Sequence, residues 1–228
     1  MANSFVTDAK KVLKIEADAL GKLKDNLPID FSDLVKRIQS LTGRVIVSGV
    51  GKSGHIGRKI SATLASTGTP SHFVHATEAS HGDLGAVTIN DVCLLISNSG
   101  ETVELANLVS HAHRFSIPLI SISSNPKSSL IKASDLKLCL PEATEACSIG
   151  LAPTTSTTMT LALGDALAIT LMQQRKFSPE HFQILHPGGK LGAQVTTVDQ
   201  LMHRGTKMPV VKPKSSMQET LQMKFLRK

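Results

Sequence analysis

The stretch VIVSGVGKSGHIG, residues 45–57, is a hydrophobic run that ends in a glycine-rich turn. Its glycines fit G-x-G-x-x-G, the pattern of a dinucleotide-binding turn, and its GKS resembles the end of a triphosphate-binding loop. A triphosphate loop requires a glycine five residues before the GK pair, where this chain has Ile46, so that interpretation fails. A dinucleotide site needs an acidic residue at the end of the second strand. Glu78 comes late for that role, so a dinucleotide remains the lesser alternative.

The segments around this turn alternate between β-rich runs and stretches of helical length. The β-rich runs are residues 44–49, 71–75, 91–97, 117–123 and 136–141. The helical stretches are residues 5–25, 31–41, 53–66, 102–115 and a long one that starts with Pro153 in its first turn and ends near Gln173. Strands separated by helices imply right-handed crossovers and a parallel sheet that is covered on both faces. The sequence therefore predicts an α/β fold, with a five-stranded parallel sheet in an α/β/α sandwich.

The composition restricts the partners and the compartment of the protein. Residues 196–228 hold seven Lys or Arg against two acids, so this tail carries +5 of the net charge of +7. No nucleic-acid-binding motif accompanies the basic tail. The chain has no apolar run long enough to cross a membrane, and its three cysteines lie far apart, as is typical of reducing compartments. We therefore expect a cytoplasmic protein that binds neither nucleic acid nor a membrane.

The residues that directly follow the strands are the candidates for a site, because ligands of such folds bind at the carboxyl ends of the strands. Hydroxyls gather in SNSGET after the third strand, where Ser97, Ser99 and Thr102 stand at the start of a predicted helix. Such a helix start is typical of an anion site, and N-capping by Ser99 would explain only one of the three hydroxyls. Together with Lys52 and Ser53 from the first turn, these residues predict a pocket for a single phosphate on a small molecule.

Four blocks of the sequence together resemble one family. The blocks are GVGKSGHIGRKISATLASTGTPSHFVHATEASHGDLGAV, ISNSGETVEL, EACSIGLAPTTSTTMTLALGDALAI and LHPGGKLG. They are similar to the sugar isomerase (SIS) domain of bacterial arabinose 5-phosphate isomerases. The resemblance implies interconversion of D-ribulose 5-phosphate and D-arabinose 5-phosphate through a cis-enediol, which supplies the octulosonate sugar (Kdo) of lipopolysaccharide or of a capsule. It implies no organic cofactor, and a homo-oligomer, expected to be a tetramer, whose sites are shared between subunits. The sequence has no H-E-x-x-H motif and no paired Cys/His spacing, so no required metal is expected.

The resemblance also implies the residues of the site. The catalytic set falls on Lys52, Glu104, Glu145 and His186, with Glu104 as the expected enediol base and Glu145 as its rival. Lys52 would stabilise the enediolate, and His186 would serve ring opening or proton transfer, in a neighbouring subunit's site. The expected substrate-binding residues are Gly51, Ser53, His81, Ser97, Asn98, Ser99 and Thr102. His81 and His186 could together hold an inhibitory zinc ion.

Two domains follow from the same comparison. We expect residues 1–195 to form the SIS domain, N-terminal helices included, and residues 196–228 to be the start of an incomplete cystathionine-β-synthase (CBS) domain.

Two other functions stay open at this point. One is a non-catalytic regulatory module that binds a sugar phosphate, and the other is an isomerase of a different phosphorylated ketose.

Overall fold

The computed structural model describes residues 2–186, 198, 202–205, 208 and 210–226. The chain forms two compact units, Met1–Ser178 and Pro179–Lys228. The boundary predicted between residues 195 and 196 falls outside the described residues and stays a prediction. The second unit contributes two described helices, α8 (Pro179–Leu185) and α11 (Met217–Leu226). No described helix is long and apolar enough to cross a membrane.

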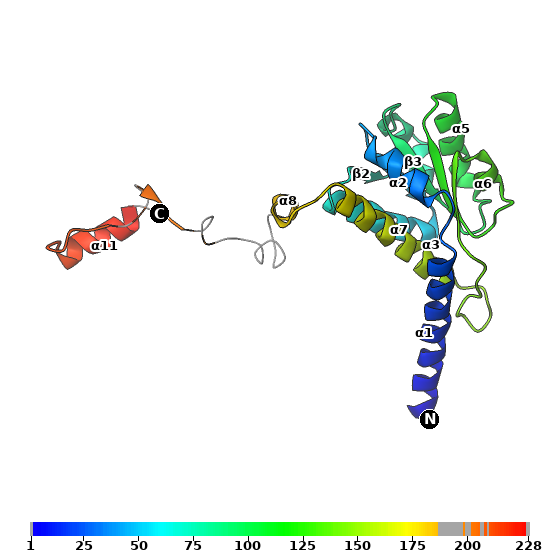
Figure 1. Cartoon of the computed structure of the whole chain (residues 1–228), viewed down its shortest axis with the longest axis horizontal. Coiled ribbons are helices and arrows are strands. Elements are labelled where there is room, and N and C mark those ends of the chain that lie inside the picture. The colour runs from blue at the N-terminus through cyan, green and yellow to red at the C-terminus, as the bar shows by residue number, and fades with distance from the viewer. Residues whose placement is uncertain (1, 187–197, 199–201, 206–207, 209, 227–228) are drawn as a thin grey trace. The chain divides into compact units, whose positions relative to one another are not determined.

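The first unit is built on a five-stranded parallel sheet (Figure 1). The strands are β1 (Val45–Gly49), β2 (Ser71–Phe73), β3 (Val92–Ile96), β4 (Leu119–Ser123) and β5 (Leu136–Cys139). Their order in the sheet is β2-β1-β3-β4-β5, and every neighbouring pair is parallel. The predicted sheet is confirmed. The order reverses between β1 and β3, so the crevice at the carboxyl ends of these two strands is the expected place for a ligand.

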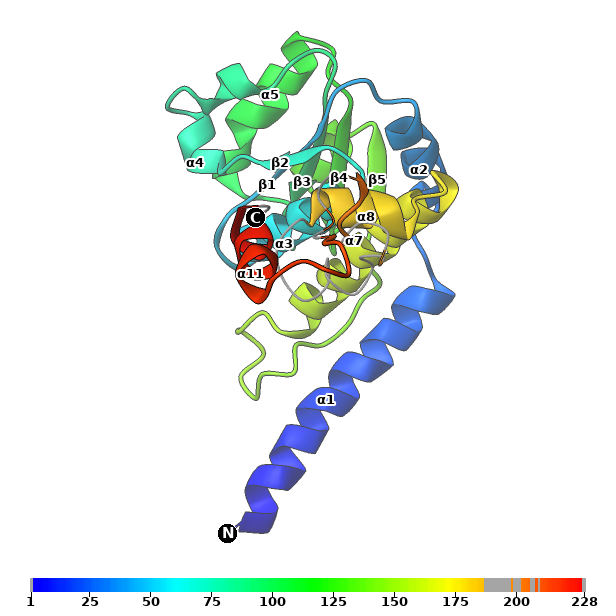
Figure 2. The ribbon, with the colours of Figure 1, turned by 90° about the vertical axis from the view of Figure 1, so that its left-hand side faces the viewer.

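Helices cover both faces of the sheet, as predicted (Figure 2). Side chains along a strand alternate between the two faces, so each buried strand contributes to two cores. One core is closed by α1 (Ala2–Asp25), α2 (Phe31–Gln39), α3 (Gly51–Ser66) and α7 (Thr155–Gln174). The other is closed by α4 (Ala76–Ala79), α5 (Ala106–Arg114), α6 (Ser129–Ala133) and the short 3₁₀ helices η1 (Asp83–Ala86) and η2 (Val103–Leu105).

Two predicted helix starts were wrong. The helix expected from residue 102 begins as a 3₁₀ turn after the cap residue Thr102, and the α-helix α5 follows only from Ala106. Pro153 does not lie in the first turn of the long helix, because α7 starts at Thr155 after the cap residue Thr154. In both places side-chain hydroxyls of Ser and Thr bind the local backbone or carboxylates, which competes with the start of a regular helix.

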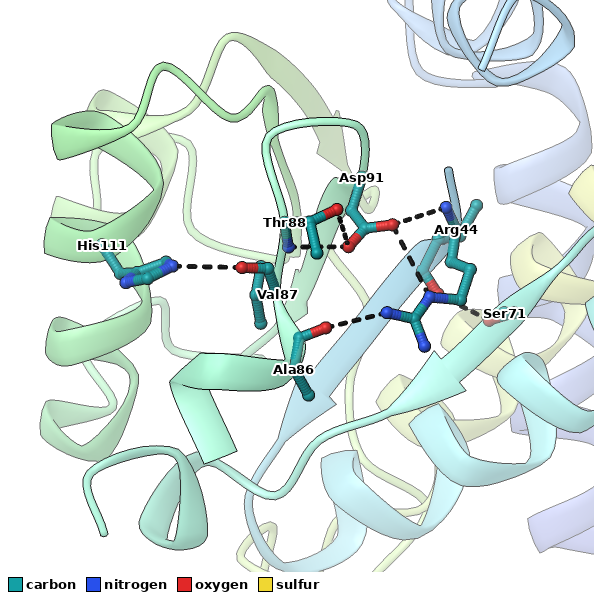
Figure 3. A network of polar contacts seen from close by, with 8 residues as sticks. Arg44, Ser71, Ala86, Val87, Thr88, Asp91 and His111 are labelled. Atoms are coloured by element: carbon teal, nitrogen blue, oxygen red, sulfur yellow. Dashed lines mark hydrogen bonds and ion pairs between the residues drawn. The ribbon is translucent and has the colours of Figure 1, made fainter. Parts of the chain in front are cut away.

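The amino ends of β1 and β3 are joined by a buried carboxylate (Figure 3). Asp91 is 2% exposed and accepts hydrogen bonds from Arg44 N at 2.7 Å and from Thr88 N at 2.8 Å. The guanidinium of Arg44 lies 3.7 Å from the same carboxylate and donates to the carbonyl of Ala86 at 2.9 Å. This network holds the segment that leads into β3 against the start of β1, at the edge of the sheet opposite to the expected ligand crevice.

The helices α3 and α7 run side by side in the same direction. Halfway along them, a Cβ on Gly164 would overlap the Ile60 side chain, so the backbones approach closely at this point. At their carboxyl ends, the guanidinium of Arg175 donates to the carbonyl of Gly68. The amino ends of both helices consequently lie at the same edge of the sheet, beside the crevice.

Candidate functional site

The glycine-rich turn places Lys52 and Ser53 in the first turn of α3. Gly51 begins the helix with a φ of +57°, which is a left-handed conformation that glycine adopts without strain. A Cβ on Gly54 would lie 2.7 Å from the carbonyl oxygen of Gly49, so the strand and the helix meet only because Gly54 lacks a side chain. The first backbone N–H groups of a helix have no partner within it, so this turn directs donors and a lysine toward the crevice.

The turn after β3 uses most of its hydroxyls internally. The buried Ser97 hydroxyl accepts from Gly100 N at 3.0 Å and lies 2.7 Å from Oγ1 of Thr102. The Ser99 hydroxyl accepts from Glu101 N at 3.2 Å, in a local turn rather than as the cap of α5. These bonds fix the shape of the loop, and binding of a phosphate by the three hydroxyls stays a prediction.

Glu145 lies at the amino end of α7 and acts as its cap. Its Oε2 accepts from Thr154 N at 2.7 Å and from Ser156 N at 3.3 Å, and its Oε1 accepts from the Ser156 hydroxyl. Partial burial by itself raises the pKa of Glu145, but the Ser156 hydroxyl and the N–H groups of Thr154 and Ser156 outweigh it. The pKa is therefore lowered, and the carboxylate is ionised and well satisfied at neutral pH.

A cavity of about 180 Å³ lies between these segments. Its lining comes from three parts of the chain that the sequence separates widely, namely the starts of α3 and α7 and the turn after β3. The lining residues are Val50, Lys52, Ser53, Ile56, Asn98, Pro153, Ser156, Thr157 and Thr160. The amino terminus of α3 and Lys52 border it, which favours an anion, whereas the amino end of α7 is already capped by the Glu145 carboxylate. The cavity thus brings together three of the predicted site residues: Lys52, Ser53 and Asn98.

Glu104 and His81 lie on the other face of the sheet from α3 and α7. Glu104 is exposed in η2, and no described residue pairs with its carboxylate. His81 comes two residues after α4, which packs against η2 and α5. Asn107 of α5 donates to the hydroxyl of Ser80 at 2.8 Å and so ties the His81 segment to the helix that follows Glu104.

His186 belongs to the second unit. Its Nδ1 lies 2.9 Å from the carbonyl oxygen of Phe182, and its ring stacks on the Phe182 ring with centroids 3.9 Å apart. The rest of the LHPGGKLG block, residues 187–192, lies outside the described residues. The role of His186 in a neighbouring site and the zinc pairing with His81 stay predictions. Within the described part of the chain, no three His, Cys, Asp or Glu side chains form a group that could hold a metal ion.

Several residues that support the site were missed by the sequence analysis. Thr154 and Ser156 hold Glu145, and Ser123 and Ser124 hold Asn98. The signals that could have found them are the hydroxyl-rich runs PTTSTT, at the start of α7, and SISSN, at the end of β4. The partners of such hydroxyls depend on which strands are neighbours, and that order is not evident in a single sequence.

A doubly wound α/β sheet with an anion-favouring cavity at its switch point is the arrangement typical of domains that bind small phosphorylated ligands. The chain belongs to the SIS domain family, whose model matches residues 40–170. The resemblance noted in the sequence is thereby confirmed.

Relatives with known names agree with this family. The chain is 50% identical over 218 residues to the arabinose 5-phosphate isomerase KdsD of Yersinia pestis, covering 95% of this chain and 66% of that relative. The chain thus spans just under two thirds of the length of the curated relatives it matches. Among solved structures, c3406 of Escherichia coli CFT073 in complex with arabinose 5-phosphate has a TM-score of 0.80 and 43% identity, covering 82% of this chain and 100% of that one. A putative sugar-phosphate isomerase of Listeria monocytogenes also has a TM-score of 0.80, with 28% identity, covering 82% of this chain and 99% of that one.

Proposed function

We propose that the protein is an aldose–ketose isomerase that interconverts D-ribulose 5-phosphate and D-arabinose 5-phosphate. The observation that carries this proposal is the cavity in which Lys52, Ser53 and Asn98 meet the amino ends of α3 and α7. It suits one phosphorylated sugar and is too small for a dinucleotide. The names of the relatives support the same substrate, since one is an arabinose 5-phosphate isomerase and a solved neighbour holds arabinose 5-phosphate.

The proposed chemistry moves one proton between C1 and C2 of the open-chain sugar. From the ketose, a carboxylate takes a proton from C1 while the carbonyl oxygen at C2 gains one, which gives the cis-enediol. The enediol then loses the proton of its O1–H and accepts a proton at C2, which gives the aldose. A base within reach of both carbons and a positive group near the developing oxyanion are what this step requires.

The contacts favour Glu104 over Glu145 as the base. The Glu145 carboxylate already accepts hydrogen bonds from Thr154 and Ser156, and its lowered pKa makes it a weak proton acceptor. Glu104 is exposed, and no described residue forms a hydrogen bond or an ion pair with its carboxylate. Lys52, at the cavity, supplies the positive charge for the enediolate. His186 is proposed to serve ring opening or proton transfer.

The proposed assembly is a homotetramer that shares its sites between subunits. The amino-terminal half of α1 extends away from its unit and exposes Phe5 and Leu13, at 74% and 66% (Figure 1). Farther along the same helix, Ala19 and Leu23 are buried in the core. Apolar side chains continue along the helix beyond the core, which supports a second subunit as their partner.

The proposal also covers the cellular location of the protein, the pathway that uses its product and its second domain. All three cysteines are free thiols, which supports a reducing, cytoplasmic location. We propose that the product supplies Kdo for lipopolysaccharide or capsule, and that residues 196–228 begin a CBS domain. No nucleic acid, organic cofactor or required metal enters the proposed reaction.

The decisive experiment follows hydrogen exchange at C1 of ribulose 5-phosphate in heavy water by NMR. We expect deuterium at C1 and the appearance of arabinose 5-phosphate with the wild-type protein, and neither with Glu104→Gln. Glu142→Gln, in the exposed loop after β5, serves as the matched control and should exchange as the wild type does. Saturable binding of the sugar phosphate without exchange would instead identify a regulatory module.

A further inference from the structure

Asn98 is held in place by the strand next to its own. It closely follows β3, whereas Ser123 ends β4 and Ser124 comes next in the chain. The hydroxyl of Ser123 and the backbone N–H of Ser124 both donate to the carbonyl oxygen of Asn98, each at 3.1 Å. Because β3 and β4 are parallel neighbours, these bonds fix the backbone of Asn98 relative to the sheet.

Ser124 also fixes the side chain of Asn98. Its hydroxyl donates to Oδ1 of Asn98 at 2.6 Å. A side-chain amide carries its acceptor oxygen and its NH₂ donor on opposite corners of one plane, so binding of Oδ1 leaves Nδ2 available on the other side. Asn98 lines the cavity together with Lys52 and Ser53. Without the bond from Ser124, these positive surroundings would attract Oδ1 of the amide, which is the wrong atom for binding an anion.

We propose that Ser124 is a positioning residue that acts through Asn98 and turns the amide so that Nδ2 donates to an oxygen of the sugar phosphate. The identity of this ligand rests on the proposed function. The site itself needs only an acceptor oxygen, on a phosphate or a sugar hydroxyl, within the cavity. Ser124 thereby contributes to affinity without touching the ligand.

A double-mutant cycle between Ser124 and Asn98 tests this inference. We expect Ser124→Ala to raise KM for ribulose 5-phosphate about tenfold, the loss of one well-aligned hydrogen bond, with kcat within about twofold of wild type. Ser124→Thr keeps the hydroxyl and should restore KM. In the Asn98→Ala background, Ser124→Ala should change nothing further, because its target is gone. Ser40→Ala removes a hydroxyl that donates to the carbonyl of Arg37 at the end of α2, and serves as the matched control.

The outcomes separate this inference from the proposed function. Dissociation constants for arabinose 5-phosphate, measured by calorimetry on the same variants with Glu104→Gln added, repeat the cycle without turnover. If the wild type isomerises and Ser124→Ala leaves KM and affinity unchanged, or if the two substitutions are additive, the positioning role is wrong. If the wild type binds but does not isomerise, the proposed function fails and the cycle in affinity still decides the role of Ser124. A wild type that binds no sugar phosphate overturns both.

Discussion

Glu145 and Ser156 are joined by a hydrogen bond between side chains, from the Ser156 hydroxyl to the Glu145 carboxylate, across eleven residues of chain. The contact closes the loop between β5 and α7 and brings a candidate base to the rim of the cavity, which Ser156 lines. One carboxylate consequently serves as the cap of the long helix α7 and lies beside the site. The contribution of Glu145 to stability, as the cap of α7, can be measured by substitution.

Glu145→Gln should reduce the stability of the protein. The substitution places an NH₂ group against the donors of Thr154 and Ser156, so we expect a loss of about 1–2 kcal/mol in the free energy of unfolding, typical of a lost helix cap. Urea unfolding followed by circular dichroism measures the loss. Glu142→Gln, in the same loop, should leave stability unchanged. A Glu145→Gln protein as stable as the wild type would show that the cap contributes nothing.

The same carboxylate should make stability depend on pH. The pKa of Glu145 is lowered from 4.5 in the folded protein, so its stabilising contribution is complete above that value. It is lost as the pH falls through the lowered pKa of the folded state. Unfolding of the wild type and of Glu145→Gln, compared from neutral pH down to about pH 3, should show a stability difference that shrinks with acid. A difference that stays constant over this range would contradict the assignment.

Asp91 should matter more for stability than any exposed ion pair. Asp91→Ala leaves Arg44 and the N–H of Thr88 without their buried acceptor, and we expect a loss of about 3 kcal/mol in the free energy of unfolding. Chemical denaturation measures this loss. Lys14→Ala breaks a pair with Asp18 in which both side chains are largely exposed, and should leave stability unchanged. Equal effects of the two substitutions would show that burial of Asp91 is unimportant.

Two glycines should respond to alanine in opposite directions. In Gly54→Ala the new Cβ meets the carbonyl of Gly49, and we expect a loss of about 1–3 kcal/mol together with weaker substrate binding. In Gly21→Ala, within α1, the new methyl has nothing within 4 Å, and a gain of about 0.5–1 kcal/mol is expected from helix propensity. Thermal unfolding and KM measurements on both variants check the pair. A Gly54→Ala protein with wild-type stability would mean that the strand and helix can separate at no cost.

The exposed half of α1 should determine the size of the assembly. Phe5→Glu combined with Leu13→Glu places two negative charges on the apolar face, and light scattering should then report a smaller particle than the proposed wild-type tetramer. Lys11→Glu changes the net charge by the same amount on the opposite face of the helix and should leave the size unchanged. An unaltered assembly in the double variant would show that subunits meet elsewhere.

The sequence predicted the sheet because each buried strand is a short apolar run that ends in glycine or hydroxyl residues. The turn at Gly51 was predictable for the same reason, since few residues other than glycine adopt its backbone conformation. The bonds of Ser124 and Ser156 were not predictable, because a hydroxyl can bind any acceptor that the fold brings to it. The late start of α5 at Ala106 was missed because Ser97 and Thr102 bind each other and shape the preceding turn.

The common direction of α3 and α7 has a consequence for how a ligand can be detected. Helices packed in parallel bring their positive ends together, and because the Glu145 carboxylate already offsets the end of α7, the end of α3 beside Lys52 is left to attract an anion. A phosphate bound there stabilises the folded state, as any ligand that binds only the folded protein does. Heating the protein with a series of phosphorylated sugars therefore ranks them by occupancy of the cavity. The melting temperature becomes an assay that works even for a compound that the protein cannot convert.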